Sequence, residues 1–476
     1  MRRLAVLGGG VAGLSAAIHA RLAGWEVEVV EPRVLGGKAA GIETAGYRLD
    51  PGPSIIILPH LYEAVFARAG RRMEDYLFFD RLDPITRVFW KGETIDIPAG
   101  LEEATETVRR LDARDAENFA DLMARLARVA PFVERSVFRA PIDRWWGLVS
   151  PDLIRTALPL WPGKPYRQAI DDLFRHPLLK AFFYGFPSYS GQSYRSASIG
   201  GFLIPYYMFA QGVFYPRGGV AAIPAAFERL ARELGATFRQ GRVSAFDRES
   251  DRVTGARLDD GEELRADAYV VAFDRFTAQA MLGEAETRPP SYSYFTVHYG
   301  LRERVSHLSH HSLIVPEDFQ AGFDALYDRR DYPDPPIVYL NDTTATDPAT
   351  APADRTNLFA VVTVPAREDH LDWEALEERG RAGIEDALRT IGIDVARIGT
   401  DFVRVQPPRY FEEAHGNYRG TLYGIDEAHR LFRGMLPHSN RDGRFRNLAY
   451  AGGAVQPGAG LPMATLSGKF AIDVLG

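Results

Sequence analysis

The chain lacks three features that would point to particular classes of protein. None of its 476 residues is cysteine, which excludes disulfide bonds, thiolate nucleophiles, cysteine-bound zinc and iron–sulfur clusters and fits a reducing compartment. No stretch has the roughly 18 uninterrupted apolar residues that a membrane-spanning helix needs. The nearest, Ile199 to Tyr215, is shorter and contains glycine and proline. A basic excess is also lacking, since the formal net charge is −7, so we expect no nucleic-acid partner.

Acidic residues are missing from one long segment, Leu173 to Phe227. Its centre, Phe182 to Tyr215, carries twelve aromatic residues. Aromatic walls suit a hydrophobic, conjugated ligand, and an isolated carboxylate would be costly in such a tunnel. A dense aromatic core fits the same composition equally well. The aromatic residues that we predict to line a tunnel are Phe182, Phe183, Tyr184, Phe186, Tyr189, Tyr206, Tyr207, Phe209 and Phe214.

A nucleotide-binding pattern stands at the N-terminus. An apolar strand, Leu4 to Leu7, precedes the turn Gly8-x-Gly10-x-x-Gly13, and a helix and a second strand ending at Glu31 follow. Gly8 permits the tight turn, Gly10 lets the backbone approach a pyrophosphate, and Gly13 lets the helix pack closely on the strand. A glycine-rich turn without a ligand is the alternative, but the flanking strand, the helix and the acid all favour a dinucleotide site.

The helix that follows this turn supplies the remaining groups of the predicted site. Its first N–H groups, at Val11 and Ala12, have no partner within the helix, and the positive end of the helix dipole favours the phosphates. Glu31, at the end of the second strand, can accept hydrogen bonds from the adenosine ribose hydroxyls.

Two further turn-rich segments are expected beside the nucleotide. Gly36 and Gly37 would expose backbone N–H groups, and Lys38 can neutralise phosphate or hold a ribose hydroxyl. A solvated loop lysine is an equally good interpretation of Lys38 on spacing alone. The second segment is Gly52-Pro53-Ser54.

The C-terminal segment repeats the order of strand, glycine turn and helix. It runs from Asn447 through Gly452 and Gly453 to Gly460-Leu461-Pro462-Met463, and a helix follows. This second turn predicts that the last helix points its positive end at another part of the same cofactor. For a flavin, that part is the N1 and C2 carbonyl edge, where negative charge collects on reduction.

Between these ends the pattern alternates between helical and strand-like segments. Leu101 to Tyr184 is mostly helical, and a helix is predicted from Val220 to Leu234. A hairpin with a turn at 259–261 and a buried strand at 268–273 return the chain to the nucleotide domain, with Val243 near the adenine. Strands at 292–301, 312–315, 337–341 and 358–365 and a helix at 373–391 predict a second α+β domain.

These motifs together resemble the bacterial-type phytoene desaturase family, the carotenoid dehydrogenases of the flavin amine oxidase group, over nearly the whole chain. The most specific match is Gly452-Gly453 with the run Pro457-Gly458-Ala-Gly460-Leu461-Pro462. The other matching segments are the first glycine turn, 36–38, 50–54, 215–219, 310–314 and 347–352. The resemblance implies FAD, a linear carotenoid substrate and C–C desaturation, with a hydride equivalent passing to flavin N5.

Two departures from the family pattern leave the substrate open. Ala454-Val455-Gln456 stands where the family usually has Gly-Thr-His, and Lys38 replaces a frequent arginine. A phytoene desaturase and a hydroxycarotenoid 3,4-desaturase fit equally well. Gln456 cannot titrate, so it offers no base, and we place it among the substrate-lining residues. Arg195 could orient a hydroxyl or stabilise flavin charge there, or it could pair elsewhere.

The expected fold class is α/β with three kinds of subdomain. A discontinuous Rossmann-like FAD-binding domain is predicted from residues 1–100, 215–285 and 436–476. A helical, aromatic subdomain is predicted at 101–214 and an α+β substrate domain at 286–435. We expect no metal, because His307, His310 and His311 lie beside a predicted strand and within a family motif.

Residues 125–167 combine basic residues with Trp145, Trp146 and Trp161. Tryptophan and arginine suit the headgroup level of an anionic membrane, and an ordinary basic face with tryptophan in the core is the alternative. We expect a cytoplasmic protein that is peripheral on the inner face of the cell membrane. Quinone or oxygen would reoxidise the flavin, because no second nicotinamide-binding glycine motif is apparent.

Three rival functions stay open on sequence alone. A carotenoid isomerase or saturase would use the same scaffold with FAD beside an apolar tunnel. A flavin-free prenyl-lipid carrier would keep a related fold, although the complete phosphate turn with Glu31 argues against it. An amine oxidase is a third possibility, which the late motif makes less attractive.

Overall fold

The computed structural model describes residues 1–142, 164–426 and 437–476. Its centre is a five-stranded sheet in the order β19-β13-β1-β2-β9, and every neighbouring pair is parallel. The strands come from three separate parts of the chain, as the sequence predicts for a discontinuous nucleotide-binding domain. Their bounds are β1 Arg3–Leu7, β2 Glu26–Glu31, β9 Thr237–Gln240, β13 Ala268–Val271 and β19 Leu448–Tyr450.

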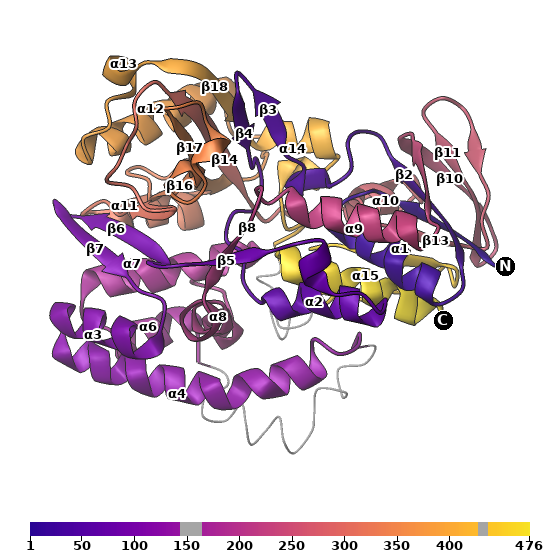
Figure 1. Cartoon of the computed structure of the whole chain (residues 1–476), viewed down its shortest axis with the longest axis horizontal. Coiled ribbons are helices and arrows are strands. Elements are labelled where there is room, and N and C mark those ends of the chain that lie inside the picture. Colours follow the sequence, from indigo (N-terminus) through magenta and orange to yellow (C-terminus); the bar gives the residue numbers. More distant parts are fainter. Residues whose placement is uncertain (143–163, 427–436) are drawn as a thin grey trace.

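Both faces of this sheet are covered. On one face, helices α1 (Val11–Leu22), α9 (Ala222–Glu233) and α15 (Leu461–Leu475) bury apolar residues against alternate strand positions such as Val6 and Val270. The other face carries a three-stranded antiparallel sheet and helix α10 (Arg275–Met281). The strands of that small sheet are β10 Val243–Glu249, β11 Arg252–Leu258 and β12 Glu263–Leu264. Both termini lie at this end of the molecule (Figure 1).

A second, seven-stranded sheet has the order β18-β14-β17-β16-β15-β6-β7. Helix α12 (Trp373–Thr390) packs on one of its faces, against residues such as Val297 and Ala360. The strands are β6 Thr86–Trp90, β7 Glu93–Ile97, β14 Tyr292–Leu301, β15 His311–Ile314, β16 Val338–Asp342, β17 Thr356–Pro365 and β18 Thr400–Gln406. The strands predicted from 292 to 365 are therefore present, and β14 has the predicted bounds.

The hairpin β6–β7 is where the structure departs from the predicted domain parts. The sequence predicts residues 1–100 as one piece of the nucleotide-binding domain, yet β6 pairs in parallel with β15 and extends the second sheet. The alternation of apolar and polar residues at 86–97 is typical of a strand pair but carries no information on which sheet the pair joins.

The third part is helical, and it lies below the second sheet in Figure 1. It consists of α3 Leu101–Leu111, α4 Ala113–Ser136, α6 Tyr166–Leu173, α7 Pro177–Gly185 and α8 Leu203–Gln211. Asp115 is fully buried at the start of α4, and its carboxylate accepts hydrogen bonds from the N–H groups of Arg175 and His176. This contact holds the entry to α7, the helix that carries Phe182, against α4.

The remaining short elements connect these parts. Strand β5 pairs with β8, so residue 82 lies opposite residue 213, and β3 pairs with β4 in a small hairpin. Their bounds, with those of the short helices, are β3 Ile42–Thr44, β4 Tyr47–Leu49, α2 Pro59–Arg68, β5 Phe79–Leu82, β8 Val213–Pro216, α11 Phe319–Asp324, α13 Val395–Ile398 and α14 Pro408–His415.

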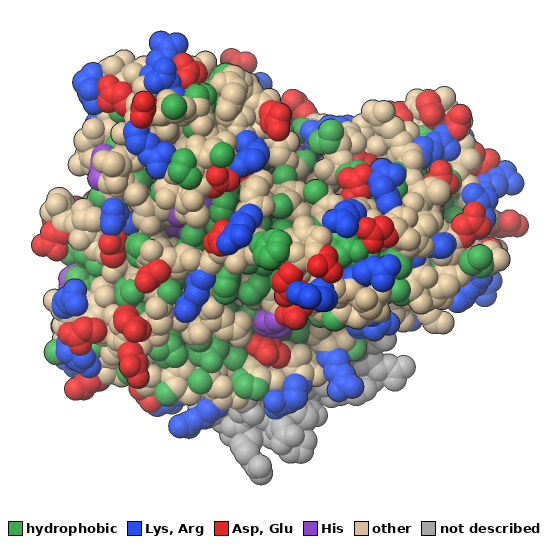
Figure 2. All heavy atoms as spheres, viewed as in Figure 1, with side chains coloured by type: hydrophobic (Ala, Val, Ile, Leu, Met, Phe, Trp, Pro, Cys, Tyr) green, Lys and Arg blue, Asp and Glu red, His purple; other side chains and the backbone are tan. Residues whose placement is uncertain are grey.

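Acidic and basic side chains are interspersed over the face shown in Figure 2. Among the described residues, no helix combines the length and the apolar character needed to cross a membrane. The predicted membrane contact at 125–167 includes residues 143–163, so Trp145, Trp146 and Trp161 lie outside the described residues.

Two of the sequence motifs meet in the nucleotide-binding part. The Asp50 carboxylate is buried, and its Oδ1 accepts a hydrogen bond of 2.9 Å from the N–H of Val220 in the turn before α9. Gly219 has a φ of +91°, and a Cβ at this position would lie 2.9 Å from Asp50 Oδ1. Segment 50–54 and segment 215–219 thus fit each other only with a glycine at position 219.

Burial raises the pKa of Asp50 from 3.8 to about 6, although the backbone hydrogen bonds of Val220 and Ala221 oppose the shift. The folded protein therefore binds a proton that the unfolded chain has lost, and stability falls as the pH rises from about 4 to about 6. Asp50→Asn keeps an acceptor oxygen and removes the titration. Across this pH window we expect the melting temperature of Asp50→Asn to rise relative to that of the wild type. The corresponding change in the free energy of unfolding is at most about 3 kcal/mol. A difference that does not change with pH, in thermal melts of both proteins, would contradict this assignment.

Candidate functional site

One large, mainly apolar cavity of about 890 Å³ lies between the three parts of the fold. The glycine turns near both ends of the chain line it, together with one face of the seven-stranded sheet and residues of α7 and α8. Within the described residues, the acidic side chains in its wall are Glu31 and Asp274. The cavity therefore joins the predicted nucleotide site to an apolar chamber.

The three glycines of the first turn have different surroundings. Gly8 has a φ of +115°, and an added Cβ would lie 2.8 Å from the carbonyl carbon of Ala272. At Gly13 a Cβ would lie 1.9 Å from the oxygen of Gly8, so this glycine allows helix α1 to sit against the strand. At Gly10 the nearest protein atom, the Cα of Gly37, would be 4.0 Å away. Of these three glycines, only Gly10 could therefore carry a side chain without contacting another part of the protein closely.

Glu31 is fixed beside this turn. Its Oε2 accepts a hydrogen bond of 2.7 Å from the N–H of Gly9, and its Oε1 accepts one of 3.2 Å from the N–H of Arg33. The N–H of Gly36 donates to the oxygen of Gly9 at 2.8 Å, which holds the second glycine segment against the first. The carboxylate consequently stands at the end of β2, in the wall of the cavity.

Lys38 is half-buried in the same wall, and its charge interacts with that of Asp274. Burial lowers the pKa of Lys38, and the charge of Asp274 opposes this shift. Burial likewise raises the pKa of Asp274, whose side chain caps α10 by accepting from the N–H of Thr277. A Cβ at Gly52 would lie 1.9 Å from the Lys38 oxygen, so segments 36–38 and 52–54 are in contact. The position in the cavity favours the phosphate or ribose interpretation of Lys38 over a solvated loop lysine.

The C-terminal turn opens onto the cavity from the other side. Gly452 has a φ of +141° and Gly460 one of +97°, and added Cβ atoms would meet no protein atom closer than 3.9 Å. Helix α15 begins at Leu461, so its positive end faces the cavity. Gly10, Gly452 and Gly460 leave space that side chains would fill, which is the cradle that a dinucleotide needs.

Helices α1 and α15 pack against each other and bring the two turns together. The Ser15 hydroxyl donates a hydrogen bond of 2.6 Å to the oxygen of Thr465, and both residues are buried. A Cβ at Gly468 would lie 2.4 Å from the oxygen of Ala12, which shows how close the two helices are.

Most of the predicted cofactor residues line the cavity, and Gly13 lies behind it, between the helix and the strand. The residues in the lining are Gly8, Gly10, Val11, Ala12, Glu31, Gly36, Gly37, Lys38, Gly52, Pro53, Ser54, Val243, Gly452, Gly453, Gly460, Leu461, Pro462 and Met463.

The aromatic segment divides between lining and core. Phe182, Phe186, Tyr189 and Tyr207 line the cavity. The other predicted aromatic residues do not, so the prediction of an aromatic tunnel made by all of them is wrong. The helical period is the reason, because successive residues of a helix point to different faces.

The other predicted aromatic residues have defined contacts outside the cavity lining. Phe183 stacks on Phe174 with ring centroids 4.7 Å apart, Phe209 packs edge-on against Phe119, and the Tyr184 hydroxyl donates to Asp171. Tyr206 packs beside Tyr207, and Phe214 contacts Phe79.

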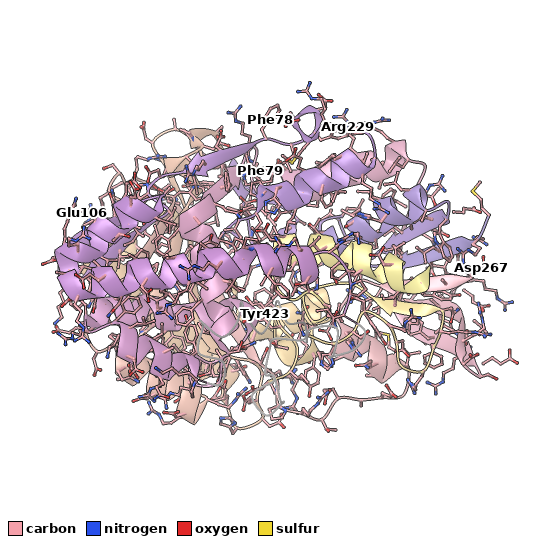
Figure 3. All side chains as sticks on the ribbon, turned by 90° about the horizontal axis from the view of Figure 1, so that it is seen from below. Phe78, Phe79, Glu106, Arg229, Asp267 and Tyr423 are labelled. Atoms are coloured by element: carbon pink, nitrogen blue, oxygen red, sulfur yellow. The ribbon has the colours of Figure 1, made fainter. Side chains whose placement is uncertain are left out.

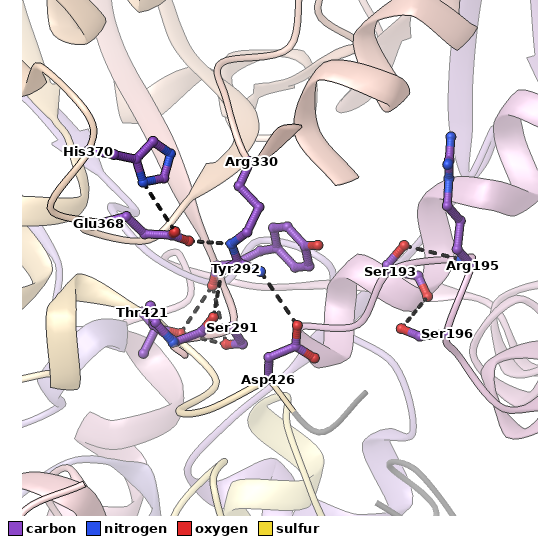
Figure 4. Close-up of polar contacts among 11 residues, drawn as sticks. Ser193, Arg195, Ser196, Ser291, Tyr292, Arg330, Glu368, His370, Thr421 and Asp426 are labelled. Atoms are coloured by element: carbon purple, nitrogen blue, oxygen red, sulfur yellow. Dashed lines mark hydrogen bonds and ion pairs between the residues drawn. The ribbon is translucent and has the colours of Figure 1, made fainter. Parts of the chain in front are cut away.

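Arg195 and Gln456 also lie outside the lining. Arg195 forms ion pairs with Asp324 and Asp328, so its charge is neutralised by carboxylates that sequence reasoning did not identify. In Figure 4 its guanidinium points away from the neighbouring Ser193 and Ser196. The Gln456 amide exchanges hydrogen bonds with the backbone of Ile142, at 2.6 and 3.0 Å, and therefore has a structural contact.

Sequence reasoning missed the floor of the cavity, which is one face of the seven-stranded sheet. Alternate residues of its strands face the cavity, and those between them face α12. The period-2 alternation in strands 292–301 and 338–342 was a usable signal. The floor residues are Tyr294, Thr296, His311, Leu313, Tyr339, Phe359, Val361 and Thr363.

Polar groups on this floor are connected to one another. The Tyr339 hydroxyl lies 2.7 Å from His311 Nδ1 and 2.8 Å from Ser54 Oγ. A second pair, Tyr294 and Tyr423, has its hydroxyls 3.1 Å apart. Tyr423 lies near the middle of the molecule in Figure 3.

The loop that carries Tyr423 is held by a half-buried network of charged and polar groups (Figure 4). Arg330 forms ion pairs with Glu368 and Asp426, and its Nη2 donates to the oxygen of Pro290 at 2.7 Å. The hydroxyls of Ser291 and Thr421 lie 2.6 Å apart beside it. Within the described ranges, no group of three metal-binding side chains is found.

A parallel nucleotide-binding sheet, a glycine cradle and a joined apolar chamber define a flavoprotein fold. The model of the family described as flavin containing amine oxidoreductase matches residues 11–473. The chain therefore belongs to this family and is an FAD-dependent oxidoreductase.

Similar proteins cover nearly the whole chain. It is 28% identical to 4,4'-diaponeurosporene oxygenase of Staphylococcus aureus over 495 residues, which cover 99% of this chain and 97% of the relative. The protein of the same name from Staphylococcus haemolyticus is 26% identical over 487 residues, covering 99% and 96%. The crystal structure of an oxidoreductase from Methanosarcina mazei matches with a TM-score of 0.63 at 16% identity, covering 99% of this chain and 100% of the other.

Gly10→Val tests the cofactor cradle. We expect the purified variant to retain below about a tenth of the wild-type flavin, because the new side chain fills ligand space and contacts no protein atom closely. The flavin-to-protein absorbance ratio measures this loss. Gly443→Val is the matched control, since Gly443 is exposed with no atom within 4 Å of its added Cβ. A normal flavin content in Gly10→Val would refute the cradle.

Proposed function

We propose that this flavoprotein oxidises a linear carotenoid and that its reaction is C–C desaturation. The observation that carries the proposal is the cavity of about 890 Å³, in which the glycine cradle opens into an apolar chamber. A conjugated hydrocarbon chain gains from burial against aromatic and aliphatic walls and needs few polar partners. The names of the relatives, which contain a carotenoid, support this substrate class.

The wall of the chamber suits hydrogen removal from an allylic CH2 group. Bound FAD supplies the acceptor of a hydride equivalent at N5. The protein positions the polyene and excludes water: Phe182, Tyr189 and Tyr207 supply aromatic surface. Both acidic side chains of the wall, Glu31 and Asp274, contact groups of the nucleotide-binding part, so the substrate meets no isolated carboxylate among the described residues.

Oxidation at the end of the polyene is the second candidate. The relatives are named oxygenases. In addition, the polar groups of Ser54, His311 and Tyr339 allow part of the chamber to form hydrogen bonds with an oxygen atom, which a hydrocarbon substrate lacks. Desaturation removes hydrogen and lengthens the conjugation, whereas end-group oxidation adds oxygen or converts a hydroxyl to a carbonyl.

We further propose that quinone or oxygen reoxidises the cofactor. The protein would work in the cytoplasm at the inner face of the cell membrane, with contact through 125–167. The solubility of a carotenoid and a quinone in lipid supports this arrangement, since both would be drawn from the bilayer.

Incubation of the purified, yellow protein with phytoene, lycopene and hydroxylated linear carotenoids tests the reaction. We expect red-shifted absorption and a product that has lost hydrogen, identified by mass spectrometry, with bleaching of the flavin when oxygen is excluded. An isomerase would leave mass unchanged, and a saturase would add hydrogen and shift absorption to the blue. Hydrogen loss from phytoene or lycopene, which carry no hydroxyl, identifies desaturation. A product with added oxygen, or a hydroxylated carotenoid whose hydroxyl has become a carbonyl, would favour the second candidate. No change in any carotenoid would contradict the proposal.

A further inference from the structure

The cavity floor contains one buried polar group without a partner. The His311 side chain is 1% exposed and lines the cavity, and its Nε2 has no hydrogen-bond partner among the described residues. An unpaired buried nitrogen is unfavourable, so its presence beside a ligand cavity calls for a ligand atom.

The contacts of the other ring nitrogen determine what this Nε2 can do. Asn341 Nδ2 donates to the His310 oxygen at 3.1 Å, which fixes the orientation of the amide. The same Nδ2 lies 3.4 Å from His311 Nδ1, and an amide nitrogen can only donate. His311 Nδ1 is therefore the acceptor of this ring, and its second neighbour, the Tyr339 hydroxyl at 2.7 Å, also donates to it.

The hydrogen bonds that lead to His311 begin in the nucleotide-binding part, and each group donates to the next. Because the Tyr339 hydrogen is directed to His311, the Tyr339 oxygen accepts from Ser54 Oγ at 2.8 Å. Burial and the neighbouring His310 keep the pKa of His311 well below its ordinary value, so the ring is neutral. A neutral ring that accepts at Nδ1 carries its proton on Nε2. The chain Ser54, Tyr339, His311 thus presents an N–H donor.

We propose that His311, held by Tyr339 and Ser54, binds an oxygen atom of the substrate, a hydroxyl or carbonyl group, and that the chain takes an oxygen-bearing linear carotenoid in preference to the hydrocarbon. This inference rests on the proposed carotenoid function and names the substrate class within it. A hydrocarbon would leave the donor unpaired, whereas both a hydroxyl and a carbonyl offer a lone pair.

The placement of the three residues agrees with such a role. Ser54 belongs to the segment predicted beside the cofactor, whereas Tyr339 and His311 belong to neighbouring strands of the second sheet. The oxygen would therefore bind where the cofactor part of the cavity meets the chamber. The floor strand next to them presents apolar surface at Phe359 and Val361, which suits the polyene beyond the oxygen.

Equilibrium binding of a matched pair tests the inference without relying on turnover. The pair is a linear carotenoid with a hydroxyl on its end and the hydrocarbon of the same chain length and conjugation. Both are titrated in detergent into anaerobic, flavin-loaded protein, and quenching of protein fluorescence reports the dissociation constants. We expect the wild type to bind the hydroxylated compound about tenfold more tightly.

Two variants remove parts of the donor chain. His311→Leu should abolish this preference by weakening only the hydroxylated ligand, and Tyr339→Phe should reduce it several-fold, because His311 loses a partner that sets its tautomer. Tyr299→Phe is the matched control: it lies on the same sheet but on the α12 side, in the core, and should keep the preference. If His311→Leu does not fold, Tyr339→Phe carries the test alone.

Three outcomes would overturn the inference. The wild type could bind both carotenoids equally while desaturating them, which leaves the proposed function intact. Tyr339→Phe could weaken both ligands to the same extent or change the flavin spectrum without ligand, which would assign the donor to the cofactor. Binding of neither carotenoid would remove the carotenoid function together with the inference.

Discussion

The site depends on two glycine turns that come from distant parts of the chain. Because glycine has no side chain, the backbone of both turns can approach a ligand closely. Gly10 stands near the beginning and Gly452 and Gly460 near the end, and added Cβ atoms at all three would occupy open space. The packing of α1 on α15, with Ser15 bonded to Thr465, holds the two turns at one place. Both helices direct their positive ends to the same cavity, so their dipoles act together on an anionic cofactor.

This arrangement explains why the nucleotide-binding part is discontinuous. Strand β19 adds to the sheet edge beside β13, and α15, which follows it, packs against α1. The helical part and the seven-stranded sheet are inserted between the three pieces, and they enclose the chamber next to the cradle. Contacts between motifs, such as Asp50 with Val220, join the pieces at their boundaries. The same packing of the three pieces therefore forms both the flavin site and the chamber.

The sequence was sufficient where local chemistry alone determines the structure. The glycines of the first turn, the acid at the end of β2 and the long strand β14 were all predicted, because a short motif or a run of neighbouring residues marks each of them in the sequence. The direction of side chains in α7 was not predictable in the same way. Phe182 and Phe183 are adjacent and equally aromatic, yet one lines the cavity and the other packs on Phe174.

Long-range partners account for the other differences. Arg195 has its carboxylate partners Asp324 and Asp328 more than a hundred residues away, and β6 joins β15 across the whole helical part. The polar floor was missed for a related reason. Tyr339 and His311 become a connected pair only when two antiparallel strands align, and their separation in the chain gives no sign of it.

We infer that one FAD is held between the two ends of the chain, at the mouth of the chamber. An experimental density map of the flavin-loaded protein is the decisive measurement. We expect the pyrophosphate beside Gly10, the adenosine ribose at Glu31 and the flavin ring against 452–463, with an open edge toward Tyr339. A cofactor bound elsewhere, or a flavin ring separated from the chamber by protein, would contradict it.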